Sequence, residues 1–303
     1  MEWFLENMFE RPWRTLGIGL PIILLIGSFI WWQAVWTDPT HVFEDMLANN
    51  LTATSVTKAI TAGTSAQGVE QTVRLEMGGT NATAWLVTAR QGNSIVTTES
   101  ISTPTTGYIR YVKIAKAQKT GKSTNYNFAN VINQWAKSDG QTDSQLNTLF
   151  NQSLLDITNA PAPPIGNLPL DQRTDALHFM RTEKVFTPDY SKVKSQTVDG
   201  RSVYTYQVSV KLAPYVRLMQ AFAQDLGLKG LESIDPSQYS TLPPLTMSVS
   251  VDKTSHQLLR ITYAPSSFTQ DYSSWGLDTP LTLPHATLTT TQLQQRLQAL
   301  RAK

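Results

Sequence analysis

The stretch LTMSVSVDKTSHQLLRITYAP, residues 245–265, carries the pattern that decides the fold. Every second residue of its first part is apolar and the residues between are mostly polar, which is the pattern of a strand with one wet face. Asp252 to His256 reads as a turn, and apolar residues recur after it. The apolar positions are Leu245, Met247, Val249, Val251, Leu259, Ile261 and Tyr263. We therefore expect an antiparallel hairpin with one face toward a core.

The same alternation occurs earlier in the chain. Turn residues separate five successive segments with strand character, at 55–62, 69–77, 83–89, 94–101 and 107–114. The pair Asp199-Gly200 is a strong hairpin signal, and alternation follows it from Tyr204 to Leu212. Because sequential strands with short turns pair antiparallel, we expect a mostly antiparallel sheet.

Helical patterns gather in blocks instead of alternating with strands. Helices are expected at 38–51, 127–137, 143–155, 171–186 and 214–226, with a short C-terminal helix from about Thr291 that docks on the domain or on a partner. The proline-rich NAPAPPIGNLPL, residues 159–170, is expected to be an internal loop, with a domain boundary as the alternative. Such blocks favour an α+β fold. We expect a curved antiparallel sheet, a half-barrel, covered by helices on its concave face and preceded by one transmembrane helix.

The N-terminal region predicts a membrane anchor. Residues Leu16 to Trp36 contain no charge, and a helix of that length spans about 31 Å, the thickness of a bilayer core. Arg11 and Arg14 precede this segment and Asp38 follows it, which favours an N-terminus inside and the main domain outside. A cleaved signal peptide is the alternative, although signal cores are usually shorter.

These patterns divide the chain into four regions. They are a short cytoplasmic segment at 1–15, interfacial or disordered; a transmembrane helix at 16–36; an extracytoplasmic half-barrel domain at 37–284 with a helical insert at about 123–186; and a helical tail at 285–303. The main domain has enough residues to build one core without disulfide bonds.

Composition excludes several classes of protein. The 303 residues include no cysteine, which excludes a disulfide framework, a thiolate zinc site, a catalytic thiol and a lipid-modified cysteine. The formal net charge is only +2, so no strong field indicates a nucleic-acid partner.

No motif indicates catalysis. The four histidines show no i, i+4 pair that would form a helical metal site. We expect His256 to be a solvent-exposed turn residue. There is no G-x-S-x-G, no P-loop and no dinucleotide fingerprint. We therefore expect no enzyme activity, no metal and no cofactor.

The second half of the chain carries a family resemblance. It runs VDGRSVYTYQVSV, then PYVRLMQAFAQDLGL, then the hairpin, then DYSSWGLDTPLTLP. This order resembles the bacterial half-barrel lipoproteins of the LppX/LprG and LolA-like class, in which "G...Y.Y.V" precedes "V.VD..TH.L..I" and a closing "S.WG....L..P". The resemblance implies that DYSSWG is the last strand, at the closing edge of the half-barrel. The predicted transmembrane anchor takes the place of the lipidated cysteine.

The resemblance also implies a hydrophobic cavity between sheet and helices that holds lipid or acyl chains. Its expected lining is Phe128, Trp135, Tyr204, Tyr206, Val208, Leu218, Met219, Phe222, Met247, Val249 and Ile261. The alternative is that these are ordinary core residues, because apolar stripes of this kind normally indicate packing. Two functions stay open: a membrane-anchored protein that binds a lipid or other hydrophobic ligand, and a non-enzymatic cell-envelope structural or interaction module with a filled core and an exposed apolar or edge-strand surface.

Overall fold

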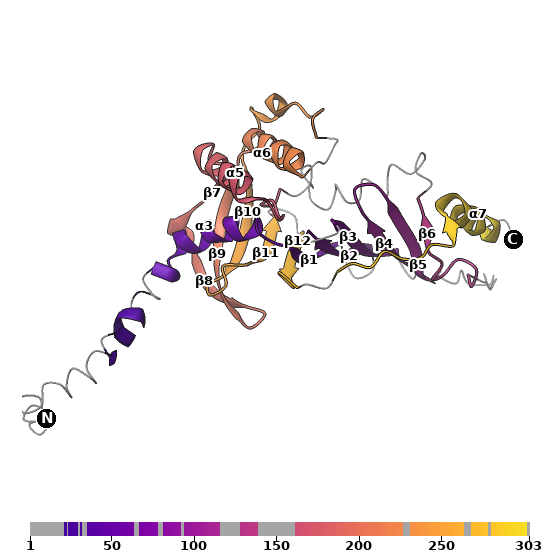
Figure 1. Cartoon of the computed structure of the whole chain (residues 1–303), viewed down its shortest axis with the longest axis horizontal. Coiled ribbons are helices and arrows are strands. Elements are labelled where there is room, and N and C mark those ends of the chain that lie inside the picture. Colours follow the sequence, from indigo (N-terminus) through magenta and orange to yellow (C-terminus); the bar gives the residue numbers. More distant parts are fainter. Residues whose placement is uncertain are drawn as a thin grey trace, which may run out of the picture.

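One large curved sheet forms the frame of the protein, with helices against one of its faces (Figure 1). The computed structural model describes residues 21–22, 24–29, 31, 35–63, 67–77, 81–91, 94–115, 128–138, 161–226, 231–263, 268–277 and 280–301. Within these ranges the sheet has thirteen strands in the order β13-β6-β5-β4-β3-β2-β1-β12-β11-β10-β9-β7, and β8 also pairs with β9. The pairing is antiparallel throughout these strands, except that β13 runs parallel to β6.

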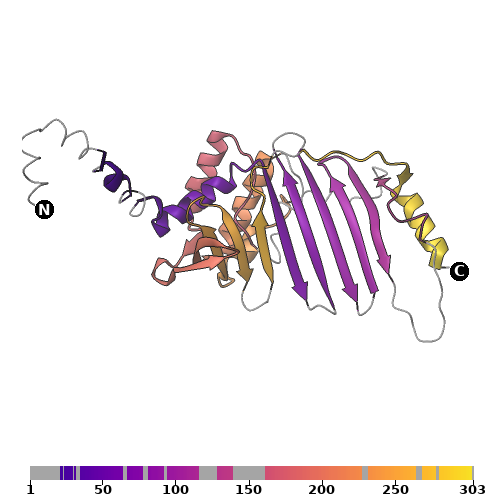
Figure 2. The ribbon, with the colours of Figure 1, turned by 90° about the horizontal axis from the view of Figure 1, so that it is seen from below.

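The strands fall into two sets along the chain. The first set is β1 (Ser55–Gly63), β2 (Gln67–Glu76), β3 (Ala82–Gln91), β4 (Ser94–Ser102), β5 (Gly107–Ala115) and the short β6 (Ala136–Lys137). The second is β7 (Phe186–Pro188), β8 (Lys194–Val198), β9 (Arg201–Val210), β10 (Leu245–Asp252), β11 (Leu258–Tyr263), β12 (Thr269–Ser273) and the short β13 (Leu288–Thr289). Figure 2 shows β1 to β5 as long neighbouring strands of one meander.

The alternating patterns predicted these strands closely. Each of the five segments expected in the first half lies within two residues of the observed strand, from β1 to β5. The hairpin at 245–265 is confirmed as β10 and β11, which pair antiparallel with Val249 opposite Ile261. The α+β architecture with a mostly antiparallel sheet is therefore confirmed.

The position expected for DYSSWG is wrong. Its strand, β12, lies in the middle of the sheet, between β1 and β11. Ile60 of β1 faces Gln270 of β12, which in turn faces Ile261 of β11. The segment therefore joins the two sets of strands into one sheet instead of closing an edge.

Strand register defines two faces of the sheet. One face, here called the inner face, carries Tyr206, Val249, Ile261, Gln270 and Ile60, which lie in one row across five strands. The same row continues across β2 to β5 with Gln71, Val87, Thr98 and Tyr111. The opposite, outer face of β2 to β5 carries ion pairs between Arg90 and Glu70 and between Arg110 and Glu99, together with apolar residues such as Leu86 and Ile101.

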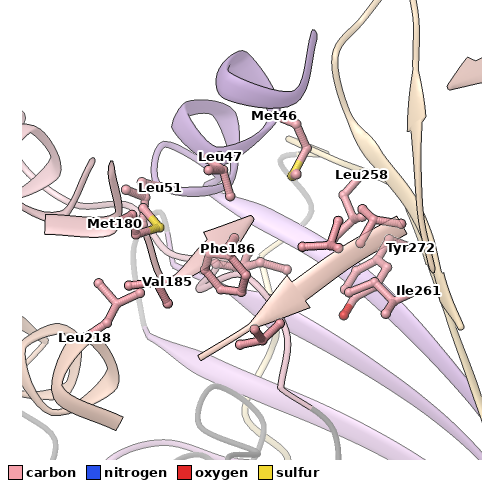
Figure 3. Close-up of a cluster of buried hydrophobic side chains, with 14 of the residues drawn as sticks. Met46, Leu47, Leu51, Met180, Val185, Phe186, Leu218, Leu258, Ile261 and Tyr272 are labelled. Carbon is pink, nitrogen blue, oxygen red and sulfur yellow. The ribbon is translucent and has the colours of Figure 1, made fainter. Parts of the chain in front are cut away.

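Three helices cover the inner face of β9 to β12. They are α3 (Pro39–Asn50), α5 (Leu170–Thr182) and α6 (Leu212–Asp225), which Figure 1 shows on one side of the sheet. Asp38 caps α3 by accepting from the backbone of Thr40 and His41. In Figure 3 the side chains of these helices point toward Leu258, Ile261 and Tyr272 of the sheet. The expectation of helices on one face is thus confirmed.

The C-terminal helix α7 (Thr290–Arg301) lies at the other end of the sheet (Figure 1). Leu293 is buried with Val131 and Ala136, and the inner-face residues Ile109 and Tyr111 of β5 pack on this small cluster. The helix expected from about Thr291 is confirmed, and it docks on its own domain.

Several helical expectations were wrong or cannot be compared. Residues 128–138 form turns and strand β6 instead of a helix, and Asn133 has a positive φ of 60°. The helix expected over 171–186 ends as α5 at Thr182, and β7 follows it. The helix expected over 143–155 lies outside the described residues.

The predicted transmembrane segment also falls partly outside the described residues, as does all of 1–15. Of 16–36, the structure describes 21–22, 24–29, 31 and 35–36, and most of these are helical. Within the described part of the chain, no helix is long and apolar enough to cross a membrane. Anchoring therefore stays a prediction.

Candidate functional site

Nine of the eleven residues expected to line a cavity come together in the main core. They are Tyr204, Tyr206, Val208, Leu218, Met219, Phe222, Met247, Val249 and Ile261. All but Tyr204 are no more than 2% exposed. The structure therefore brings sheet and helices together as expected, but it packs their side chains as a core.

Tyr206 shows how this core is closed. Its hydroxyl donates to the Pro39 carbonyl at 2.8 Å, and its ring packs 5.1 Å from that of Phe43. Burial raises the pKa of Tyr206 well above its ordinary value, so the hydroxyl keeps its proton and its role as donor. This side chain fastens the start of α3 to the sheet.

The other two candidates lie elsewhere. Phe128 and Trp135 belong to the segment beside β5, and neither is part of the core below α3, α5 and α6. The Arg110 guanidinium lies 4.7 Å from the centre of the Trp135 ring. Because Arg110 belongs to the outer face, Trp135 is not part of a lining on the inner face.

A cavity of about 730 Å³ lies on the outer face of β9 to β11, beneath the short helix η2 (Tyr190–Lys192). Six of the residues that line it are Lys192, Lys194, Thr205, Gln207, Thr246 and Ser248. Hydroxyl, amide and ammonium groups share this lining with Val193, Tyr206, Met247 and Tyr263. This is not the apolar cavity between sheet and helices that the sequence led us to expect.

The inner face of β2 to β4 has a different character. Val73 and Leu75 of β2 are still fully buried, whereas Val69, Trp85, Val87 and Val96 are half-buried and Ala89 is exposed. The members of this set, here called the β2–β4 strip, are Val69, Gln71, Trp85, Val87, Ala89, Val96 and Thr98. The described helices lie at its two ends, with α3, α5 and α6 at one and α7 at the other (Figure 1). Trp85 packs against the main core, and the other members of the strip are not among the residues of that core.

A polar cluster lies on the inner face between the core and the strip. Gln270 is 1% exposed, and its Oε1 accepts from the Tyr272 hydroxyl at 2.5 Å. Lys58 lies directly opposite Tyr272 in the register of β1 and β12 and is also buried. The sequence held a signal for this cluster that was missed, because Lys58 interrupts the apolar parity between Val56 and Ile60.

A second cluster shows that the expectation for His256 was wrong. Its side chain is 1% exposed, and Nδ1 donates to Asp45 Oδ2 at 2.9 Å. His41 Nε2 lies 3.2 Å from the same oxygen. The Trp36 ring stacks on His256 with centroids 4.5 Å apart. The turn after β10 is thus covered by α3 and the residues that precede it.

The His256 cluster provides no catalytic arrangement. Nε2 of His256 is buried without a hydrogen-bond partner, so no described nucleophile lies within its reach. The described residues also contain no group of three or more His, Cys, Asp or Glu side chains that could hold a metal ion. The cluster instead links the N-terminal segment to the domain.

Comparisons with known proteins add one likeness to this picture. No family model and no curated protein matches the chain. Among solved structures, the crystal structure of LprF from Mycobacterium bovis is similar, with a TM-score of 0.35 and 14% identity over 80% of this chain and 94% of that chain. LprF belongs to the LppX/LprG class that the sequence resembles. At this TM-score the likeness carries no argument about what this chain binds.

Proposed function

We propose that this protein is held at a membrane by residues 16–36 and binds a lipid or another hydrophobic ligand on the β2–β4 strip. The single observation behind this proposal is the change in burial of the apolar side chains along the inner face of the sheet. Val249 and Ile261 are fully buried under the helices, whereas Val69, Val87 and Val96 keep the same parity and are only half-buried. The ligand surface is therefore displaced from the expected cavity to the neighbouring part of the same sheet.

The two faces of β2 to β4 differ in the way a lipid-binding sheet requires. On the outer face, Arg90 Nη2 lies 3.2 Å from Glu70 Oε2, and the hydroxyls of Thr88 and Thr97 are 3.2 Å apart. The inner face of the same strands carries no charged side chain among its described residues, and its apolar members include Val69, Trp85, Val87 and Val96. Burying such apolar surface against an acyl chain stabilises the complex by about 25 cal/mol per Å².

The N-terminal region supports the membrane part of the proposal. Leu24, Leu25 and Phe29 lie in a helical stretch and are 61%, 71% and 62% exposed. An exposed apolar helix of this kind is expected to be covered by lipid. The basic flank at Arg11 and Arg14 favours a domain outside the membrane.

The absence of native cysteine makes this orientation testable. Thr105 lies in the turn between β4 and β5 and is exposed. We expect the Thr105→Cys variant, expressed in a bacterial host, to react in intact cells with a maleimide that cannot cross the inner membrane. Reaction only after lysis would contradict an extracytoplasmic domain, and the cysteine-free parent is the blank.

The interaction module is the second candidate, and one observation favours it. The residues expected to line a cavity pack as a core on the inner face of β9 to β11, which is what a domain without a ligand requires. The two candidates differ in what the β2–β4 strip contacts. Detection of a hydrophobic ligand bound to the strip would favour the first candidate over the interaction module.

A matched pair of tryptophan variants tests ligand binding. Val87 lies on the inner face, and its neighbour Leu86 lies on the outer face and is 43% exposed. With the full chain in amphipol and a diazirine derivative of palmitate, we expect Val87→Trp to lower photolabelling about tenfold, roughly 1.4 kcal/mol of binding free energy. The added ring would occupy the surface that the acyl chain covers. Leu86→Trp is expected to label like the parent.

The site of labelling decides between the two candidates. Labelled peptides should map to β2, β3 and β4. Absence of specific labelling in the parent, or equal loss in both variants, would favour the interaction module.

A further inference from the structure

The cavity on the outer face of β9 to β11 lies apart from the surface to which we assign a hydrophobic ligand. Its volume of about 730 Å³ falls within the range of about 300–1,000 Å³ that is typical of sites for small molecules. The helices α3, α5 and α6 cover the opposite face of the same strands (Figure 1). Several side chains of its lining are exposed, so the cavity opens to solvent. A ligand bound here is independent of the proposed function.

A row of polar side chains forms the floor of this cavity. Gln207 of β9 lies directly opposite Ser248 of β10, which lies opposite Thr262 of β11. Neighbouring strands are about 4.8 Å apart, so the three side chains extend over about 10 Å. Met247 and Tyr263 alternate with these residues and are buried in the core on the other face. The outer-face floor is therefore polar.

The polar groups of the floor are open to a ligand. Thr246 lies two residues before Ser248 on the same face of β10 and adds a fourth group. Within the described part of the chain, no hydrogen bond to another residue engages any of these four side chains. The Thr205 hydroxyl differs, because it accepts from Gln196 at 2.7 Å and lies 3.0 Å from the Ser250 hydroxyl. Hydroxyl and amide groups both donate and accept, so the floor suits a ligand that carries several hydroxyl groups.

Two lysines give one wall of the cavity its charge. Lys192 Nζ lies 2.9 Å from Asp189 Oδ2, and hydrogen bonds from Ser191 and this lysine lower the pKa of Asp189, so the carboxylate stays ionised and balances Lys192. Lys194 faces Thr205 in the β8–β9 pair, which places it on the outer face. Within the described residues its ammonium group has no hydrogen-bond or ion-pair partner. No acidic residue is among those described as lining the cavity, so one positive charge there is uncompensated.

We propose that this cavity binds a sugar or another polyol that carries one anionic group, a phosphate or a carboxylate. The amide and hydroxyl groups of the floor exchange hydrogen bonds with the hydroxyls of the ligand, and the Lys194 ammonium pairs with its anion. Hydrogen bonds between ionised groups are about twice as strong as neutral ones, so Lys194 sets the preference for a charged over a neutral sugar. An apolar ligand would cover the floor without satisfying its polar groups.

Titration calorimetry with the full chain in amphipol tests this ligand class. The probes are glycerol 3-phosphate, glucose 6-phosphate and glucuronate, and glucose and inorganic phosphate are the neutral and the free-anion controls. We expect at least one anionic probe to bind about tenfold more tightly than either control. Equal affinity for glucose would overturn the role of the anion, and equal affinity for inorganic phosphate would overturn the polyol. Absence of saturable binding by all three probes up to about 10 mM would overturn the proposal.

A matched pair of lysine variants tests where the anion binds. Lys194→Gln removes the uncompensated ammonium, whereas Lys113→Gln removes an exposed lysine of β5, toward the other end of the sheet. We expect Lys194→Gln to weaken the tightest-binding anionic probe about tenfold and to leave glucose binding unchanged. Lys113→Gln should bind both as the parent does. Equal losses in the two variants would show a general effect of surface charge and overturn the site.

A change in the floor locates the rest of the ligand. Gln207→Glu keeps the shape of the side chain and places a carboxylate beside the proposed anion. Gln207 is exposed, so we expect the midpoint of unfolding and the labelling by diazirine palmitate to match the parent while binding of the anionic probe is lost. Unchanged binding of the probe in Gln207→Glu would place the ligand outside this cavity.

Discussion

Replacing Phe222 by alanine is expected to lower the free energy of unfolding by about 3–5 kcal/mol. The ring is 1% exposed in the core between α6 and the sheet, so its removal takes away buried apolar contacts and leaves a cavity. Chemical denaturation of the full chain, compared with the parent, measures the change. Phe222→Leu is the control, because it keeps most of the volume and should have a clearly smaller effect.

Gly166 provides an independent check on how tightly this ring is held. A Cβ atom on Gly166 would lie 2.8 Å from Cζ of Phe222, and the Phe222 side chain is buried in the core. Gly166→Ala should therefore destabilise the parent and have a smaller effect in the Phe222→Ala background. Strict additivity of the two changes would contradict direct contact between them.

The Phe222 result also bears on where a ligand binds. If Phe222 lined a ligand cavity, its truncation would alter photolabelling and leave stability almost unchanged. We expect the reverse, a large loss of stability with probe binding preserved below the unfolding transition. If Phe222→Ala lost probe binding while its stability matched the parent, the ligand would bind in the helix-covered part of the inner face.

The sequence specified local structure better than long-range pairing. Strands β1 to β5 were predicted within two residues because strict alternation is a local signal with few competing interpretations. Residues 128–138 misled, since Phe128, Val131, Ile132 and Trp135 have helical spacing. There Asn133 adopts a positive φ, and Ile132 forms a bridge with Tyr111, so tertiary pairing overrides the local pattern. The central place of β12 depends on pairing with β1, more than 200 residues away, which no local pattern shows.

The candidate site, like the fold, could be predicted from the sequence only in its local features. Parity identified the inner face correctly for the six strand residues of the predicted lining, Tyr204, Tyr206, Val208, Met247, Val249 and Ile261, but parity alone does not show which part of a face the helices cover. That depends on where α3, α5 and α6 dock. The polar cluster was within reach of the sequence, because Lys58 and Gln270 stand at apolar parity, and buried polar residues of this kind are the informative exceptions.

His256 shows a further limit of local patterns. The turn at 252–256 was predicted correctly, and the Asp252 side chain does accept from Thr254 and Ser255 within it. The His256 side chain is instead covered by distant residues: Asp45 on α3, 211 residues away, accepts from its Nδ1, and the Trp36 ring stacks on it. A turn residue was expected to be exposed because nothing nearby in the sequence covers it.

Replacing Asp45 by alanine is expected to lower the free energy of unfolding by about 1–3 kcal/mol. Asp45 accepts from the buried Nδ1 of His256 at 2.9 Å and also contacts Nε2 of His41. Its removal leaves both ring nitrogens of His256 without partners, because Nε2 already has none. Chemical denaturation measures the loss, and Asp45→Asn, which retains an acceptor oxygen, should lose less.

Glu44→Ala is the matched control for Asp45→Ala. Glu44 precedes Asp45 on α3 and pairs with Arg181 at 3.0 Å, but both of these side chains are at least half exposed. Exposed ion pairs contribute about 0–1 kcal/mol, so Glu44→Ala should stay near the parent. If both variants lowered the free energy of unfolding equally, the histidine cluster would contribute no more to stability than an exposed ion pair does.

The Asp45 variant also tests the link between the N-terminal segment and the domain. Trp36 stacks on His256 and donates from Nε1 to the Thr254 carbonyl at 3.2 Å, and Trp36 is the last residue of the predicted membrane span. If the histidine cluster holds this contact, Asp45→Ala should increase proteolytic cleavage around residues 35–38 at denaturant concentrations where the domain remains folded. If cleavage rises only as the whole domain unfolds, Asp45 stabilises the core but does not hold the N-terminal segment against the domain.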